Sequence, residues 1–156
     1  MKMINQISIV LISISFLLFV SCVCELFGSH ELGNNIVLLE GDRPEDRIIV
    51  YCTGRSGGCC SGGVSIIPTY ENHIKQDMYN EYVEGAKSNN KWIIARSYRI
   101  LEKSHKFWII NKNFNIDSLD CNKIDCDSVI QSHVIGPLDS LIFLEKVKEL
   151  DVNLYF

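Results

Sequence analysis

Cysteine is the residue type that offers this chain the most chemistry. Seven cysteines occur among the 156 residues, and none lies after position 126. A cysteine thiol can bind a metal, attack a carbonyl, carry a lipid or close a disulfide, and its spacing and neighbours decide between these uses. The first of them, Cys22, stands apart from the six that follow: Cys24, Cys52, Cys59, Cys60, Cys121 and Cys126.

Cys22 ends an uncharged apolar run that follows the single positive charge of Lys2. The apolar stretch of residues 7–20 has the length of an export signal, and the small residue Ser21 directly precedes the cysteine. Lipoprotein processing attaches a diacylglyceryl group to such a cysteine and cleaves the chain before it. We therefore expect residues 1–21 to be a lipoprotein signal peptide and Cys22 to carry a lipid anchor in a bacterial cell envelope.

An uncleaved membrane anchor is the alternative interpretation of this run. Residues 4–24 carry no charge and reach the ~20 residues that a membrane span needs. Phe19 also departs from the aliphatic residue usual three positions before a lipidated cysteine. Under either interpretation, the rest of the chain faces away from the cytoplasm.

The six remaining cysteines are expected to form disulfides, because exported proteins fold in oxidising surroundings. Cys121 and Cys126 bracket a short loop and are expected to pair with each other. Cys52 is expected to pair with Cys59 or Cys60, and the sequence leaves that choice open. A zinc site is disfavoured, because no Cys-x2-Cys pair occurs and no paired histidines follow at ligand spacing.

Residues 52–63, CTGRSGGCCSGG, are the strongest candidate for a functional loop. Glycine-rich backbone and one guanidinium, that of Arg55, can hold an anion. The Gly-Lys-Ser/Thr ending of a nucleotide-binding loop is absent, however. We expect a loop pinned by a disulfide from Cys52, with Arg55 at an exposed tip that contacts a partner. The other residues of this tip are Ser56, Gly57 and Gly58.

Catalytic and metal-binding alternatives have less support. Cys60 with His105 or His133 as its base would make a thiol hydrolase, but no flanking motif accompanies them. Four clustered carboxylates could form a calcium site: Asp117, Asp120, Asp125 and Asp127. Their spacing does not match an EF-hand loop, however, and the central glycine of such a loop is absent. We therefore assign no catalytic residue, no metal and no cofactor.

Strand-length apolar segments separated by turns must position these residues. The expected strands are residues 35–40, 47–51, 64–67, 82–86, 91–100, 106–112, 129–134 and 152–156. Residues 52–63 are expected to be irregular because of their glycine content, and residues 69–80 show no clear period. The sequence predicts an α+β fold, mainly one antiparallel β-sheet (a meander), with a single C-terminal helix packed on it.

Gly136 and Pro137 are expected to open that helix, since proline is tolerated in a first helical turn. Its apolar face is formed at helical spacing by Phe143, Leu144, Val147 and Leu150. Leu138, Leu141 and Ile142 lie off this stripe, which predicts that the first turn is buried on more than one side. Trp92 and Trp108 are expected on adjacent strands, in the core or, alternatively, stacked on an envelope glycan.

Length and charge limit the possible partners. Without residues 1–21, the chain keeps 135 residues, enough for one globular extracytoplasmic domain spanning residues 22–156. This domain carries 14 basic and 19 acidic residues, a net charge of −5, with its basic residues scattered singly. An acidic domain of this kind is not expected to bind nucleic acid.

Five short motifs resemble those of an uncharacterised family of small bacterial cell-envelope lipoproteins, and they occur in this order: residues 31–33 (ELG), 66–68 (IIP), 91–95 (KWIIA), 107–112 (FWIINK) and 136–138 (GPL). The resemblance covers most of the mature chain and lies in structural motifs. It implies an envelope location and a compact fold. It transfers no catalytic residue, and the cysteine-rich insert is not part of it.

The sequence leaves two classes of function. The first is a lipid-anchored binding or structural module of the envelope, with an envelope protein or glycan as its partner. The second is a small thiol hydrolase or an inhibitor of an envelope enzyme. Periplasmic lysozyme inhibitors are likewise small, anchored, disulfide-bearing β proteins, and a Ser-Gly loop that enters an enzyme cleft would be their manner of acting.

Overall fold

The computed structural model describes residue 24, residues 28–69 and residues 80–156. The predicted signal peptide, the lipidation site Cys22 and most of the segment 69–80 lie outside the described residues. Among the described residues, no helix is both long and apolar enough to cross a membrane.

The first half of the described chain folds into a four-stranded antiparallel sheet. Its strands follow one another in chain order, so each pairs with the next. A short 3-10 helix, η2 (Pro44–Asp46), connects the second strand to the third. The strands are β1 (Ser29–Gly33), β2 (Ile36–Leu39), β3 (Ile48–Ser56) and β4 (Cys59–Ile67).

The second half repeats this arrangement with a second four-stranded antiparallel sheet, again in chain order. A long connection that contains helix α4 (Cys126–Gln131) joins its third strand to its fourth, and helix α5 (Ser140–Glu149) follows the sheet. The strands are β5 (Glu81–Ser88), β6 (Trp92–Arg99), β7 (Ser104–Asn111) and β8 (Val134–Leu138).

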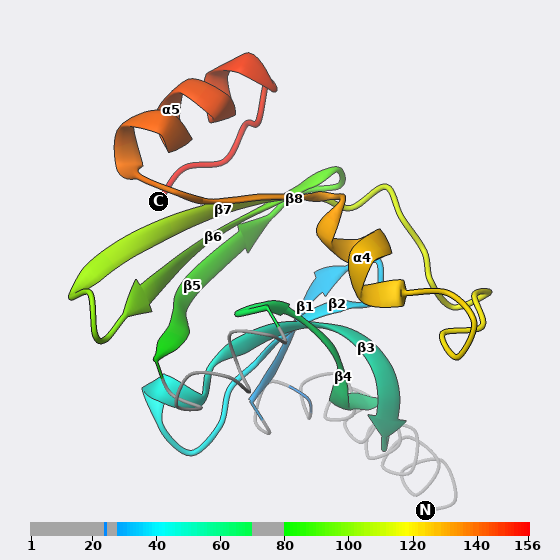
Figure 1. The fold of residues 1–156 in the computed structure, drawn as a ribbon. Helices are drawn as coiled ribbons and strands as arrows, with labels where there is room; N and C mark the ends of the chain where they lie inside the picture. The colour runs from blue at the N-terminus through cyan, green and yellow to red at the C-terminus, as the bar shows by residue number, and fades with distance from the viewer. Residues whose placement is uncertain (1–23, 25–27, 70–79) are drawn as a thin grey trace, which may run out of the picture.

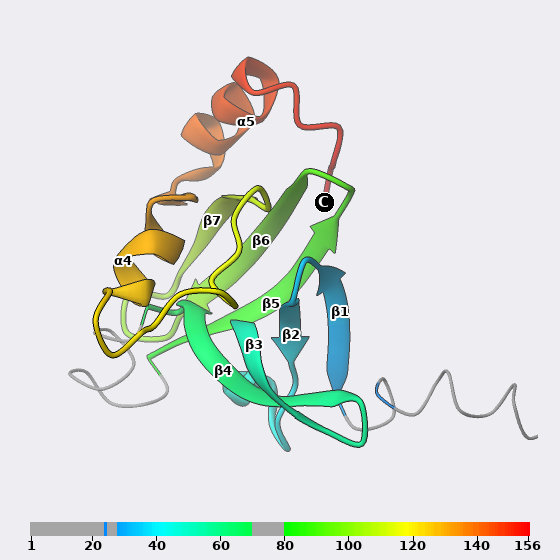
Figure 2. The same cartoon turned by 90° about the vertical axis from the view of Figure 1, so that its right-hand side faces the viewer.

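The main hydrophobic core lies between the two sheets (Figures 1 and 2). β-branched residues fill it because their side chains pack well on a pleated surface. Helix α4 closes one side of this core with Ile130. Fully buried members from both sheets include Ile36, Ile49, Ile66, Val83, Ile93 and Ile110.

Helix α5 covers the outer face of the second sheet and forms a separate cluster there (Figure 1). Phe143 and Val147 of α5 are buried against Ile94 and Ile109 of the sheet. The prediction that a helix near the end of the chain packs on the meander is thus confirmed. The predicted α+β class is confirmed as well, but the described residues form two sheets where the sequence predicted one.

The glycine-rich segment is regular structure, contrary to the prediction of an irregular loop. Residues 52–63 form the paired ends of β3 and β4, and Ser56 faces Cys59 across a two-residue turn. Gly57 and Gly58 take φ values of 60° and 88° there, which is the left-handed backbone that tight hairpin turns require. A Cβ on Gly63 would overlap the carbonyl oxygen of Tyr51, so this position must also be glycine.

The predictions for the end of the chain need three corrections. Residues 129–133 do not form a strand, and only Val134 of the predicted segment belongs to β8. The chain is helical here because Asp125 caps α4 by accepting a hydrogen bond from the Ser128 amide at 3.1 Å. Gly136 and Pro137 belong to β8, and α5 begins three residues after Pro137. Residues 152–156 form no strand, although Val152 is buried in the cluster beneath α5.

Two sets of buried hydrogen bonds link different parts of the fold. Trp108 donates its indole N–H to Ser97 at 2.8 Å, and Ser97 donates its hydroxyl to Glu81 at 2.6 Å. Lys112 is only 5% exposed and donates to the carbonyl oxygen of Leu32 at 2.9 Å, so it bridges the two sheets. Burial lowers the pKa of the Lys112 amine, because the charged form loses solvation.

Candidate functional site

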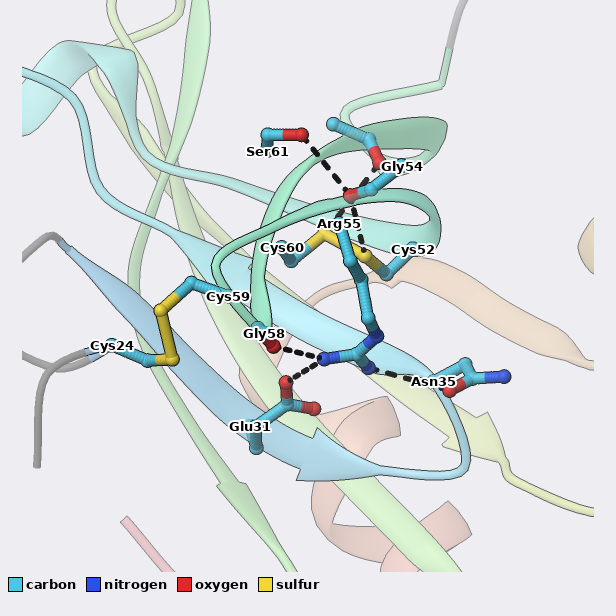
Figure 3. Close-up of a disulfide and its surroundings, with 11 residues drawn as sticks. Cys24, Glu31, Asn35, Cys52, Gly54, Arg55, Gly58, Cys59, Cys60 and Ser61 are labelled. Carbon is cyan, nitrogen blue, oxygen red and sulfur yellow. Dashed lines mark hydrogen bonds and ion pairs between the residues drawn. A yellow bond between two sulfur atoms is a disulfide. The ribbon is translucent and has the colours of Figure 1, made fainter. Parts of the chain in front are cut away.

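Six cysteines form three disulfides. Cys121 pairs with Cys126, which confirms the predicted local pair. The open choice for Cys52 is resolved, because Cys52 pairs with Cys60 across β3 and β4. Cys59 pairs instead with Cys24, 35 residues earlier in the chain (Figure 3).

Arg55 is folded back onto β1 (Figure 3). Its guanidinium forms an ion pair with Glu31 at 2.8 Å and donates to the carbonyl oxygen of Gly58 at 3.1 Å and to Asn35 at 3.3 Å. The hydrogen bond to Glu31 raises the pKa of Arg55. The charge of Arg55 is therefore balanced within the chain. The exposed residues at the hairpin tip, Ser56, Gly57 and Gly58, are uncharged.

A polar groove lies beside Arg55, where the β1–β2 turn meets the connection after β7. Two adjoining cavities of about 390 and 460 Å³ share Asn35 as a lining residue. Asn35 donates to Asp117 at 2.8 Å, and the hydroxyl of Tyr51 lies 2.9 Å from the same carboxylate. Burial raises the pKa of Tyr51, which keeps its hydroxyl protonated. The polar groups of this groove bind one another, so the groove is part of the scaffold that holds Arg55.

The thiol hydrolase interpretation loses its nucleophile, because the sulfur of Cys60 is bonded to Cys52. Its two candidate bases also lie in unrelated surroundings. His105 lies 3.2 Å from Glu84 on the second sheet, whereas His133 stacks on Phe114 with ring centroids 5.0 Å apart.

The acidic residues of the cysteine-bearing connection have separate structural tasks. Asp117 belongs to the polar groove, and Asp125 caps helix α4. Asp120 forms an ion pair with Lys123 at 3.0 Å, and this contact lowers the pKa of Asp120. Within the described residues, no three side chains of His, Cys, Asp or Glu are grouped so that they could hold a metal ion.

The two tryptophans lie on adjacent antiparallel strands, as predicted, but on opposite faces of the sheet. Trp92 packs in the outer cluster with α5, and Trp108 packs in the core between the sheets. They are 7% and 2% exposed, so neither ring offers a face on which a sugar could stack. The interpretation of these residues as a glycan platform is therefore wrong.

An apolar groove between α5 and the last residues of the chain was not predicted. It has a volume of about 230 Å³, and Phe107 and Phe143 form its floor. Its walls include Leu144, Tyr155 and Phe156, which are 58%, 68% and 46% exposed. We call these five residues the α5 groove.

Leu141 and Ile142 are 76% and 47% exposed, so the prediction that the first turn of α5 is buried on more than one side is wrong. Leu141 precedes Leu144 by three positions and therefore lies beside it on the helix surface. A polar rim adjoins the groove, since the guanidinium of Arg96 lies 5.7 Å from the ring centre of Phe156. The sequence placed Leu144 on the apolar face of the helix together with Phe143, and that part of the prediction is wrong because Leu144 is 58% exposed. Leu141 was one of the apolar residues that lay off this face.

The chain was compared with models of protein families, with curated proteins and with solved structures, and none of the three comparisons found a match.

Proposed function

We propose that this protein is a lipid-anchored binding module of the bacterial cell envelope, attached to a membrane through Cys22. The pairing of the six other cysteines into three disulfides is the observation that supports this proposal most. Such pairing is typical of chains that fold outside the cytoplasm, and it leaves none of the six free as a catalytic thiol. The resemblance to envelope lipoproteins points to the same location.

The α5 groove is the surface that we assign to partner binding. Large exposed apolar side chains around a concave site, with a charged rim, are typical of protein–protein contacts. The groove offers aromatic rings as anchors and few hydrogen-bonding groups. We therefore infer that its ligand is an apolar side chain or segment of another envelope protein.

The lipid anchor is tested by labelling cells with a radioactive fatty acid. The wild-type chain is expected to incorporate the label and to lose residues 1–21. Cys22→Ala should abolish the label and leave the precursor uncut, whereas Cys24→Ser should keep both events. Unchanged labelling of Cys22→Ala would rule out lipidation at this residue.

Partner binding is tested with the soluble domain from residue 24 onward. Leu144→Asp places a charge at the α5 groove and is expected to abolish stoichiometric capture of an envelope protein. Leu101→Asp is the matched control, because Leu101 is 77% exposed in the turn between β6 and β7. Equal capture by both variants would remove the α5 groove from the proposal, and turnover of an envelope substrate would favour an enzyme.

Inhibition of an envelope enzyme is the second candidate. Its support is the β3–β4 hairpin, whose exposed tip is fixed by two disulfides and by the contacts of Arg55. A preorganised hairpin loses little entropy when it enters a cleft. The soluble domain should then inhibit a muramidase at a one-to-one ratio, and Arg55→Ala should weaken the inhibition. No inhibition at equimolar protein would exclude this candidate for that enzyme class.

A further inference from the structure

We propose that the tip of the β3–β4 hairpin, Ser56 to Cys59, contacts the headgroup surface of the membrane that carries the anchor, so that the α5 groove points away from it. This proposal rests on the proposed membrane attachment at Cys22. It deepens the proposed function by assigning one surface to the membrane and the opposite surface to the partner.

Covalent distance is the first part of the argument. The Cα atoms of Cys24 and Cys59 are 5.1 Å apart, and Cys24 lies two positions after Cys22 in the chain. Two residues span at most ~7 Å, so Cys59 must lie within about 12 Å of the lipidated residue. The headgroup layer on one side of a bilayer is ~6 Å thick, so Cys59 is held within about two such thicknesses of the lipidated residue.

Without this disulfide the attachment would be much looser. The first strand begins at Ser29, seven residues after Cys22, and seven extended residues reach ~25 Å. A tether of that length would let the domain turn freely above the membrane. The Cys24–Cys59 disulfide halves the maximum distance between Cys22 and the folded domain. It also adds an attachment at the hairpin to the one at the start of β1.

The hairpin itself is rigid enough to transmit this constraint. The Cys52–Cys60 disulfide joins its two strands next to Cys59, and Arg55 joins β3 to Glu31 of β1 (Figure 3). The first sheet therefore follows the orientation of the tip. Helix α5 lies at the opposite end of the molecule from this tip (Figures 1 and 2).

The chemistry of the tip suits a headgroup surface. Ser56, Gly57 and Gly58 are exposed and uncharged, and no atom lies within 4 Å of a Cβ built on either glycine. Among the described residues beside the tip, Arg55 and Glu31 carry opposite charges that neutralise each other. An acidic domain is repelled by anionic lipids, so an uncharged tip is the part that can approach them most closely.

Depth-dependent fluorescence quenching tests the orientation. The full-length chain would be produced with a fluorescent amino acid in place of Ser56 or of Leu141. Each form would be reconstituted in vesicles of phosphatidylethanolamine and phosphatidylglycerol that contain a nitroxide-labelled headgroup lipid. Quenching is expected to be several-fold stronger at position 56 than at position 141. Equal quenching at the two positions would overturn the proposal.

A pair of matched disulfide variants shows whether the constraint is the one proposed. Cys24→Ser with Cys59→Ser should reduce quenching at position 56 toward the value at position 141. Cys121→Ser with Cys126→Ser removes a disulfide away from the anchor and should leave quenching unchanged. Equal effects of the two pairs would overturn the role of the Cys24–Cys59 disulfide.

Fatty-acid labelling of the same samples separates this proposal from the lipid anchor. Chains that associate with vesicles without the label would disprove lipidation. Stronger quenching at position 56 would still support the orientation in that case, because the Cys24–Cys59 disulfide would link the hairpin equally to an uncleaved membrane anchor. Labelled chains with equal quenching would keep the lipid anchor and overturn the orientation.

Discussion

The hairpin end and the α5 end of this molecule are held together by different forces. Around the hairpin, glycine and serine supply almost no side-chain area, and two disulfides with one ion pair fix the backbone. Around α5 the residues after position 126 contain no cysteine, and stacked aromatic rings supply the contacts. Backbone that buries little apolar area needs covalent links to offset its conformational entropy.

Phe143→Ala should have the largest effect at the α5 end. Phe143 is 5% exposed and its ring stacks on Phe107 with centroids 4.9 Å apart. Removing a buried phenylalanine ring is expected to lower the free energy of unfolding by about 3–5 kcal/mol. Urea unfolding of the oxidised protein measures this loss.

Leu144→Ala is the control for that change, because Leu144 is 58% exposed on the same helix. It should alter the free energy of unfolding by only about 0.5 kcal/mol. Similar losses in both variants would mean that α5 does not dock through Phe143, and the contrast between the two ends would then disappear.

Removal of the Cys24–Cys59 disulfide should have the largest effect at the hairpin end. Cys24→Ser with Cys59→Ser opens a loop of 35 residues, and the entropy of the unfolded chain then rises by an amount worth about 3–4 kcal/mol. The measurement is urea unfolding under non-reducing conditions.

Cys52→Ser with Cys60→Ser is the comparison variant, because this disulfide closes a separation of only 8 residues. Its expected loss is about 2.5 kcal/mol. A reversed order of the two losses would show that packing within the hairpin, rather than chain entropy, dominates the stability of this end.

Arg55→Ala should have a small effect on stability. The side chains of Arg55 and Glu31 are 38% and 44% exposed, so solvent screens their attraction. We expect a loss of about 0.5–1 kcal/mol in urea unfolding. A loss above 2 kcal/mol would indicate that the ion pair, and not the disulfides alone, fixes the hairpin.

Lys112 should give a weak but distinctive pH dependence. Burial lowers its pKa in the folded state from the usual 10.5, so the folded protein releases this proton before the unfolded chain does. Stability should therefore rise with pH between the folded and unfolded pKa values. The rise should be absent from Lys112→Met when both proteins are unfolded in urea across this range. Parallel pH profiles of the wild type and Lys112→Met would show that Lys112 does not cause the pH dependence.

The meander of the second sheet could be predicted from the sequence because local patterns determine it. Residues 91–100 and 106–112 combine β-branched and aromatic residues with a turn, and they form β6 and β7. The division into two sheets could not be predicted, since the strands within each sheet follow chain order, as they would in one continuous meander. Only the break between β4 and β5 separates them, and that segment has no clear period.

The sequence of the glycine-rich hairpin contains a turn signal, but the glycines around it predicted irregular structure. Gly57-Gly58 is a typical two-residue hairpin turn, but the low strand propensity of glycine disfavoured strands on either side of it. Hydrogen bonding of the backbone and two disulfides override that propensity. The pairing of Cys59 with Cys24 and the contact of Arg55 with Glu31 join positions distant in sequence, so no local pattern could indicate them.

The hydrogen bonds of Trp108 couple the effects of substitutions at neighbouring positions. The single proton of Ser97 is donated to Glu81, and its oxygen accepts the indole N–H of Trp108. Ser97→Ala would leave that N–H without a partner inside the core, which costs about 1–3 kcal/mol. Combined with Trp108→Phe, the same change leaves no unpaired donor, so the two losses should not add. A redesign of this core should therefore vary positions 97 and 108 together.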